Sequence, residues 1–389
     1  MKRHRPAQKM NGIAPFRVMD ILARAKNLEA LGKDVIHMEV GEPDFPAPPA
    51  VLAAAQKALK SGFTHYTPAA GLTALREAIA TYYQTRFALD IDPQRIVITP
   101  GASGALQLVL GVLLDMGDEV LLQDPGYPCN RHMVMLYGGQ SRTLPTGPHG
   151  FDATLASSAV TENTRAMLLA SPANPTGEVI DLLDLKQLYQ FLMQSDNKCL
   201  IVDEIYQGLQ YDSEINTALS LGEEGLFVIN SFSKFFGMTG FRLGWMVVPG
   251  NFAEPVERLA QNLFLAPSTI AQYAALAAFS EKNMALLEAR RAIFEQRRDV
   301  LYSELRSLGF TLDSTPSGAF YIYAGIQGLA ESGDQLASGL LQESSVAITP
   351  GNDFGFAGTD QHVRFAYTTD LSRIEQGIER IARYLSHGR

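Results

Sequence analysis

The stretch RIVITPGASGALQLVLGVLL (95–114) joins a strand-like run, through a glycine-rich turn, to a helix-like run. The flanking sequence continues the pattern, with helix-like ALREAIATYYQTRF (74–87) before it and strand-like EVLLQ (119–123) after it. Short leucine-rich and β-branched runs recur at RAMLLAS (165–171), KCLIVDE (198–204), LFVINSF (226–232) and RLGWMVV (242–248). This alternation predicts an α/β fold with a mostly parallel central sheet covered by helices on both faces.

The ends of the chain show a different pattern, which predicts a second, smaller α+β domain. The amphipathic segment 284–307 is expected to be a connecting helix. It is followed by four strand-like runs and a last helix, in the order FTLDS (310–314), AFYIYAG (319–325), VAITPG (346–351), HVRFAYT (362–368) and SRIEQGIERIARYL (372–385). Residues 16–31 form another expected helix. We therefore expect an N-terminal arm at 1–14, a large domain at 45–280, and a small domain of 15–44 together with 281–389.

Composition excludes several classes of protein. A chain of 389 residues exceeds one ordinary domain core, and its formal net charge of -9 argues against nucleic-acid binding. No segment approaches the roughly 20 apolar residues of a membrane-spanning helix, and no signal peptide is evident, so we expect a cytoplasmic protein. The two cysteines, Cys129 and Cys199, are predicted to be buried free thiols and not metal ligands.

Polar or aromatic residues follow five of the predicted strands. The turn PGASGAL (100–106) opens a helix and suits a phosphate, although it also suits a simple helix cap. Tyr127, Asn174, Asp203 and Lys234 follow the next four strand-like runs. Each has an ordinary explanation alone, such as packing, a backbone hydrogen bond, an ion pair or a solvated surface. Because ligands of open α/β sheets bind outside the carboxyl ends of the strands, the set together indicates a ligand site.

Several of these segments resemble known motifs in a known order. SFSKFFGMTGFRLG (231–244) is similar to the lysine signature of class I aminotransferases, which have fold type I of the pyridoxal-phosphate enzymes. ASPANPTG (170–177), VDEIY (202–206) and GEPDF (41–45) resemble the other motifs of that family. The resemblance runs from about residue 12 to the end of the chain.

The resemblance implies how the cofactor, pyridoxal 5′-phosphate, is held. Lys234 is expected to form the Schiff base and then to act as the base that moves a proton between Cα and C4′. Asp203 is expected to pair with the pyridine nitrogen, and Tyr127 to stack on the ring. Asn174 and Tyr206 are expected to hydrogen-bond the phenolic oxygen O3′. The phosphate is expected to bind to Ala102, Ser103, Ser231, Ser233 and Arg242, and to Tyr66 from the neighbouring subunit of a homodimer.

The resemblance also implies the substrates. Arg364, in HVRFAYT, is expected to bind the substrate α-carboxylate, helped by Gly41 and Asn174; without the resemblance it reads as a strand-edge arginine. The implied activity moves an amino group from an α-amino acid to a 2-oxo acid through pyridoxamine phosphate. Some relatives carry a lysine in the glycine-rich turn where this chain has Ser103 and Gly104, which weakens a preference for acidic substrates. APF (14–16) and Phe264 are expected to line a pocket that tolerates apolar side chains.

Two other functions remain open on sequence alone. A C–S β-lyase would use the same cofactor residues and begin with the same proton removal, but would release pyruvate and ammonia. A cofactor-binding transcription regulator would need a DNA-binding domain, and no helix-turn-helix extension or basic patch is evident.

Overall fold

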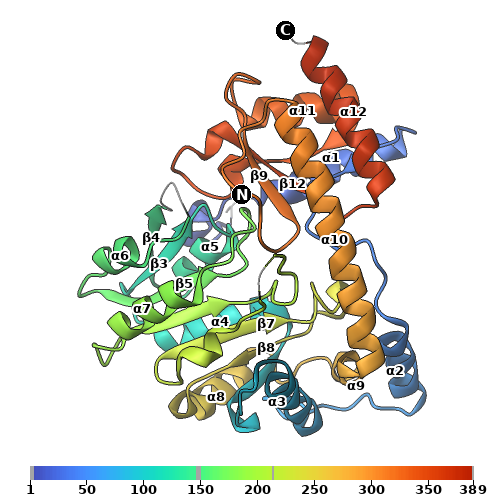
Figure 1. The fold of residues 1–389 in the computed structure, drawn as a ribbon. Helices are drawn as coiled ribbons and strands as arrows, with labels where there is room; N and C mark the ends of the chain where they lie inside the picture. Colours follow the sequence, from blue (N-terminus) through green and yellow to red (C-terminus); the bar gives the residue numbers. More distant parts are fainter. Residues whose placement is uncertain (1–3, 146–149, 213, 388–389) are drawn as a thin grey trace.

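The structure is a computed structural model that describes residues 4–145, 150–212 and 214–387 (Figure 1). Its strands are β1 (Ile36–His37), β2 (Ile96–Thr99), β3 (Glu119–Asp124), β4 (Gln140–Pro145), β5 (Thr164–Ala170), β6 (Cys199–Asp203), β7 (Leu226–Ser231), β8 (Gly244–Val247), β9 (Tyr321–Gly325), β10 (Val346–Ala347), β11 (Thr349–Pro350) and β12 (His362–Ala366).

The α-helices are α1 (Arg17–Ala30), α2 (Pro49–Lys60), α3 (Thr73–Phe87), α4 (Gly101–Leu113), α5 (Cys129–Leu136), α6 (Ala153–Ser158), α7 (Leu182–Leu192), α8 (Ala253–Leu263), α9 (Thr269–Leu276), α10 (Glu281–Ser307), α11 (Gly333–Ser344) and α12 (Leu371–His387). Short 3₁₀ helices are η1 (Gln8–Gly12), η2 (Pro93–Arg95), η3 (Ala218–Leu221), η4 (Thr239–Phe241), η5 (Gly250–Phe252), η6 (Ala277–Phe279), η7 (Gly351–Asp353) and η8 (Thr359–Gln361).

The large sheet has the order β2-β8-β7-β6-β5-β3-β4 within the described residues. β8 runs antiparallel to both of its neighbours, and the other pairs are parallel. The carboxyl ends of β2, β3, β5, β6 and β7 therefore meet at one edge of the sheet, and the chain enters β8 from that same edge. The predicted mostly parallel α/β sheet is confirmed.

Two apolar cores lie on the two faces of this sheet, because successive residues of a strand point to opposite faces. In β6, Leu200 and Val202 belong to one core, while Cys199 and Ile201 belong to the other. The first core is completed by side chains of α3, α7 and α9, and the second by side chains of α4, α5 and α8. Both faces are thus covered, which explains why these strands are apolar throughout.

The N-terminal and C-terminal parts of the chain pack together above this sheet (Figure 1). β1 pairs with β10, 310 residues later in the chain at Ile36 and Val346, and a three-stranded sheet has the order β11-β12-β9. The long helix α10 extends alongside both parts of the molecule, from α9 up to α12 (Figure 1). These pairings support the division into a large domain at 45–280 and a small domain of 15–44 with 281–389, which we retain as a proposal.

Two expectations about secondary structure were wrong, and one strand was missed. FTLDS (310–314) is not a strand, because Thr311 alone forms a bridge, with Gly325. VAITPG splits into β10 and β11, which belong to different sheets. The edge strand β4 was missed, because its sequence QSRTLP has neither the apolar run nor the regular alternation of a buried strand. Cys199 is buried as predicted, but Cys129, at the start of α5, is only partly buried; both thiols are free.

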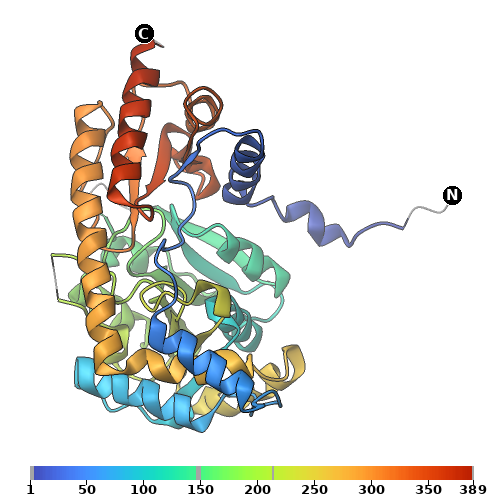
Figure 2. The same ribbon diagram turned by 90° about the vertical axis from the view of Figure 1, so that its right-hand side faces the viewer.

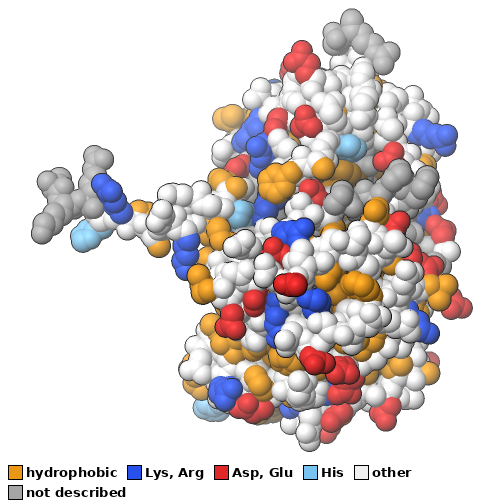
Figure 3. All heavy atoms as spheres, turned by 90° about the vertical axis from the view of Figure 1, so that its left-hand side faces the viewer, with side chains coloured by type: hydrophobic (Ala, Val, Ile, Leu, Met, Phe, Trp, Pro, Cys, Tyr) orange, Lys and Arg blue, Asp and Glu red, His pale blue; other side chains and the backbone are white. Residues whose placement is uncertain are grey.

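The N-terminal arm leaves the body of the molecule (Figures 2 and 3). Its described part contains η1, in which no residue is buried. Residues 1–3 of the predicted arm lie outside the described residues. The arm leads directly into α1, whose first residues approach the candidate site described below.

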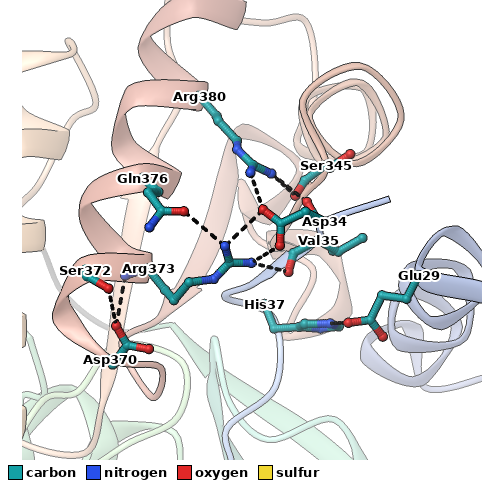
Figure 4. Close-up of polar contacts among 10 residues, drawn as sticks. All are labelled: Glu29, Asp34, Val35, His37, Ser345, Asp370, Ser372, Arg373, Gln376 and Arg380. Atoms are coloured by element: carbon teal, nitrogen blue, oxygen red, sulfur yellow. Dashed lines mark hydrogen bonds and ion pairs between the residues drawn. The ribbon is translucent and has the colours of Figure 1, made fainter. Parts of the chain in front are cut away.

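An ion-pair cluster ties the segment after α1 to the last helix (Figure 4). Asp34 accepts hydrogen bonds from Arg373 Nη2 at 2.7 Å and Arg380 Nη2 at 2.5 Å, both on α12. These two guanidinium groups lower the pKa of Asp34 to about 2. His37, in β1, links α1 to the segment that follows β1. Its Nε2 lies 3.1 Å from Glu29 Oε1, and its Nδ1 lies 2.8 Å from Glu39 Oε1. In the described residues, no helix is long and apolar enough to cross a membrane.

Candidate active site

A cavity of about 650 Å³ lies at the edge where the carboxyl ends of the strands meet. It is lined by the residues that follow β2, β3, β5, β6 and β7, and by residues from α1, β9 and β12. Twelve of the thirteen site residues predicted from the sequence line this cavity: Gly41, Ala102, Ser103, Tyr127, Asn174, Asp203, Tyr206, Ser231, Ser233, Lys234, Arg242 and Arg364.

Lys234 lies at the centre of this site, just after β7, and is only partly exposed. Its Nζ donates a hydrogen bond to the carbonyl oxygen of Gly41 at 2.6 Å. The amine lies 5.9 Å from the ring centroid of Tyr206 and 5.8 Å from that of Phe320. Burial is the main cause that lowers the pKa of Lys234, to about 8, and the nearby Arg364 contributes in the same direction. The lowered pKa makes the neutral, nucleophilic amine more abundant at neutral pH than it is for an ordinary lysine.

Asp203 ends β6 as a buried carboxyl group. Its Oδ1 accepts a hydrogen bond from the backbone N–H of Ile205 at 3.1 Å. Burial raises the pKa of Asp203 to about 6, while that backbone bond and Lys234 oppose the shift. A buried carboxylate is stabilised by a cation, so the side chain suits a protonated ring nitrogen in the cavity.

The start of α4 and the segment before β8 form a cradle for an anion. Gly101 has φ +71°, and a β-carbon there would lie 2.9 Å from Arg242 Nη2. A β-carbon at Gly244 would lie 2.8 Å from the carbonyl carbon of Gly101. The two glycines therefore allow the guanidinium of Arg242 to approach the N-terminus of α4, where free N–H groups point outward. Arg242 Nη1 also lies 3.5 Å from Ser233 Oγ, which adds a hydroxyl group to the cradle.

A buried hydrogen-bond chain supports this cradle from behind. Glu204 accepts hydrogen bonds from Ala218 N at 2.6 Å and Gln207 Nε2 at 2.7 Å. Gln207 Oε1 accepts from Asn230 Nδ2 at 2.9 Å, and Asn230 Oδ1 accepts from Ser231 N at 2.7 Å. This series of hydrogen bonds joins the ends of β6 and β7, so it holds Ser231 in place relative to Asp203.

Arg364, on β12, is almost completely buried although it is charged. Nη1 donates to Asn174 Oδ1 at 2.8 Å, and Nη2 donates to the carbonyl oxygen of Glu39 at 2.5 Å. The guanidinium carbon lies 4.2 Å from the ring centroid of Tyr321 and 4.6 Å from that of Phe354. Its buried Nε has no hydrogen-bond partner among the described residues. A planar cation held between two rings in a cavity suits a carboxylate ligand.

Tyr321 is a site residue that sequence reasoning missed. Its hydroxyl lies 2.9 Å from that of Tyr206. A β-carbon at Gly41 would lie 1.6 Å from the Tyr321 hydroxyl oxygen, so only glycine permits this approach. Tyr321 begins the largely buried strand β9, YIYAG, and its sequence offers no signal that distinguishes it from a packing residue.

Some predicted residues do not enter the cavity. Tyr66 is 84% exposed and lies outside it. Of the residues expected to line a side-chain pocket, Phe16 does line the cavity, whereas Ala14, Pro15 and Phe264 do not. No group of three or more His, Cys, Asp or Glu side chains that could hold a metal ion occurs in the part of the chain that the structure describes.

Comparison with known proteins identifies the family. The family model described as aminotransferase class I and II matches residues 33–381. The chain belongs to the class I and II aminotransferases. A transaminase for (5-formylfuran-3-yl)methyl phosphate from Methanocaldococcus jannaschii is 38% identical over 375 residues, which cover 95% of this chain and 97% of that protein. The valine–pyruvate aminotransferase of Mycobacterium tuberculosis is 35% identical over 377 residues, covering 96% and 97%.

Solved structures of aminotransferases share the whole fold. A structure of the aspartate aminotransferase from Thermus thermophilus with maleate matches with a TM-score of 0.93 at 32% identity, covering 98% of this chain and 100% of that one. This aminotransferase therefore has fold type I, and its cofactor is pyridoxal 5′-phosphate. The cavity fits that group chemically, because it presents an amine of lowered pKa, a buried carboxyl group and a cradle for a phosphate.

Proposed function

We propose that this aminotransferase holds pyridoxal 5′-phosphate in the cavity around Lys234 and there exchanges an amino group between an α-amino acid and a 2-oxo acid. The observation that carries the proposal is the position of the Lys234 amine. It shares one cavity with the carboxyl group of Asp203 and the guanidinium of Arg364. An amine nucleophile, a partner for the ring nitrogen and a carboxylate site are the three groups that this chemistry requires.

The cofactor would be held at both ends. Lys234 would bond its aldehyde carbon, Asp203 would pair with the ring nitrogen, and Tyr127 would cover the ring. Asn174 and Tyr206 would donate hydrogen bonds to O3′. The phosphate would be bound by the N-terminus of α4 and nearby side chains, namely Ala102, Ser103, Ser231, Ser233 and Arg242.

The bound cofactor supplies an electron sink for the pair of electrons left on Cα when its proton is removed. After the substrate amine has displaced it from the aldehyde carbon, the freed Lys234 amine would carry that proton between Cα of the substrate and C4′. The lowered pKa of Lys234 suits this role, because a general base works best when its pKa lies near the operating pH.

Arg364 would orient the substrate by its α-carboxylate. The carbonyl oxygen of Gly41 accepts a hydrogen bond from Lys234, and that of Glu39, two residues earlier, accepts one from Arg364. Asn174 already bonds Arg364 at 2.8 Å, so one amide would align both the arginine and O3′. The contact of Arg364 with the α-carboxylate and the contact of Asn174 with O3′ would together set the Cα–H bond toward Lys234.

We further propose a homodimer in the cytoplasm. Tyr66 is highly exposed and lies outside the cavity of its own chain, which fits a tyrosine that reaches the phosphate in the other subunit. Mixing the Tyr66→Phe protein with a second variant that is altered in the cavity would form dimers with one subunit of each kind. The activity of these mixed dimers would test whether the two sites are shared.

One experiment separates transamination from β-elimination. The cofactor-loaded protein is mixed with single amino acids, and the absorption band of the lysine-bound cofactor is followed. We expect the band to convert to that of pyridoxamine phosphate, and a panel of 2-oxo acids to regenerate it. If no amino acid drives the conversion, or if pyruvate and ammonia appear without an acceptor, transamination is the wrong function.

The pKa of Lys234 predicts the pH dependence of cofactor loading. Only a neutral amine attacks an aldehyde. Because the pKa is lowered from 10.5 to about 8, we expect the loading rate of the cofactor-free protein to rise with pH and to level off above about pH 8. Stopped-flow absorbance would measure this rate.

The Glu42→Gln variant is the matched comparison for that measurement. The carboxylate of Glu42 raises the pKa of Lys234, so its removal should move the midpoint to lower pH. A midpoint near 10.5 in the unaltered protein would contradict the expected burial of the amine.

A further inference from the structure

Two tyrosine hydroxyl groups meet at the cavity, on side chains that are both buried within one chain. The hydroxyl oxygens of Tyr206 and Tyr321 lie 2.9 Å apart, and either group can donate the hydrogen bond. Tyr206 is 4% exposed and Tyr321 is 2% exposed. Because both side chains are already enclosed, the contact needs no residue from a second subunit.

The hydroxyl of Tyr321 is held in position by what surrounds its ring. The guanidinium carbon of Arg364 lies 4.2 Å from the ring centroid, and the ring of Phe320 packs against it with centroids 5.0 Å apart. Next to the hydroxyl lies the bare Cα of Gly41, where a β-carbon would come within 1.6 Å of the oxygen. Packing around the ring therefore keeps the hydroxyl against Tyr206.

The number of available protons sets the direction of the hydrogen bond between the two tyrosines. A tyrosine hydroxyl donates one proton and accepts through its oxygen. In the proposed function, Tyr206 gives its proton to O3′ of the cofactor. The 2.9 Å contact then requires Tyr321 to donate and Tyr206 to accept.

Arg364 favours the same direction. Burial raises the pKa of Tyr321, and the positive charge of Arg364 opposes that rise. A cation beside a phenol stabilises negative charge on its oxygen, so it makes the O–H group a stronger hydrogen-bond donor.

We propose that the Tyr321 hydroxyl donates a hydrogen bond to Tyr206 and thereby strengthens the hydrogen bond that Tyr206 donates to O3′. Tyr321 is then a positioning residue, which acts on the cofactor through Tyr206. The inference rests on the proposed function, because that function places Tyr206 against O3′. A hydroxyl that accepts one hydrogen bond becomes a better donor of the next, by roughly 10–30% per bond.

The measurable consequence is a lower pKa of the nitrogen that joins Lys234 to the cofactor. While this nitrogen is protonated, its own N–H shares the negative charge of O3′. Once the proton is lost, that charge depends on the donors Asn174 and Tyr206. Stronger donation by Tyr206 therefore favours the deprotonated form. The absorption band of the lysine-bound cofactor reports this protonation without any turnover.

A series of single and double variants tests the relay from Tyr321 through Tyr206. The loaded enzyme is titrated with pH, and the midpoint of the band change is measured. Tyr206→Phe should raise the midpoint by roughly one to two pH units. Tyr321→Phe keeps the ring over Arg364 and should raise it by roughly 0.3 unit. In the Tyr206→Phe background, Tyr321→Phe should cause no further shift, because the relay has lost its middle member.

Tyr323→Phe is the matched control for the loss of a hydroxyl from the same strand. Tyr323 follows two residues later in β9, and its ring stacks on that of His362 with centroids 4.8 Å apart. The midpoint of this variant should stay unchanged. A shift in Tyr321→Phe no larger than in the control, or an equal shift with and without the Tyr206 hydroxyl, would overturn the relay while leaving the proposed function intact.

Two further results bear on the placement of Tyr206 and on the cofactor site. An unchanged midpoint in Tyr206→Phe would remove Tyr206 from O3′ and would overturn the relay. A band that is absent from the unaltered loaded protein, or a cofactor not reducible onto Lys234, would contradict the proposed function itself.

Tyr321→Leu separates the hydroxyl of Tyr321 from its ring. This variant loses the ring beneath Arg364 as well, so the KM for the amino acid should rise by about tenfold in addition to the shift of the midpoint. Tyr321→Phe should leave that KM within about twofold, because the ring remains. If Tyr321→Phe raises the KM as much as Tyr321→Leu does, the hydroxyl acts through general packing and the relay is wrong. The thermal unfolding midpoint of each variant shows that the comparison is made on folded protein.

Discussion

Replacing Lys234 with alanine is expected to abolish the covalent attachment of the cofactor and to lower kcat/KM by about 10⁴-fold or more. The change removes both the amine that bonds the aldehyde and the base that moves the proton. The protein should still fold, because Lys234 contacts the rest of the site through one hydrogen bond and two ring contacts. Mass spectrometry after borohydride reduction, together with steady-state kinetics, measures the two losses.

Lys282→Ala is the control for this experiment. Lys282 is an exposed residue of α10, so the reduced cofactor should remain attached to that variant. A cofactor that stays reducibly attached to the Lys234→Ala protein would show that another lysine forms the bond.

Replacing Asp203 with asparagine is expected to lower kcat on the order of 1,000-fold while the cofactor still binds. The amide has almost the same shape, but it does not hold the ring nitrogen protonated. The loss should therefore appear in the proton-removal step, which a substrate deuterated at Cα reveals as a larger isotope effect. Absorption spectra of the loaded variant show whether the ring environment has changed.

Asp196→Asn is the matched substitution at an exposed position and should leave kcat within about twofold, as is usual for surface sites. If Asp203→Asn behaves like this control, the buried carboxyl group has no part in activating the cofactor. Loss of folding is distinguished by the thermal unfolding midpoint, measured on both variants.

The central sheet was predictable from the sequence because its strands carry their own signal. Strands β5, β6 and β7 are buried on both faces, so each is a continuous apolar run bounded by polar residues. The edge strand β4 lacks such a run and was missed. FTLDS resembles a strand locally, but only Thr311 finds a partner, at Gly325, and pairing with a distant segment cannot be deduced from local periodicity.

The candidate site was predictable to the extent that its residues follow strands. Asn174, Asp203 and Lys234 each come within a few residues of a strand end, so strand order alone brings them to one edge. Arg364 entered by resemblance to a family, since an arginine in a short strand has no local mark of function. It lies in β12, the central strand of the small sheet, and is not the strand-edge arginine that the sequence suggests without the resemblance. Tyr321 had neither signal and emerged from the structure through its contact with Tyr206.

Local sequence by itself therefore determined the α/β architecture and the strand-end positions of the candidate site, because periodicity and strand-end position are properties of neighbouring residues. The lysine-centred cofactor chemistry was implied by the resemblance of the motifs to those of class I aminotransferases. Tertiary structure decided which groups surround Lys234. Gly41 lies 193 residues away in the chain, and Asn174 and Arg364 are 190 residues apart, yet both pairs are joined by hydrogen bonds. The lowered pKa of Lys234 arises from that assembly, because burial depends on which distant segments pack around a side chain.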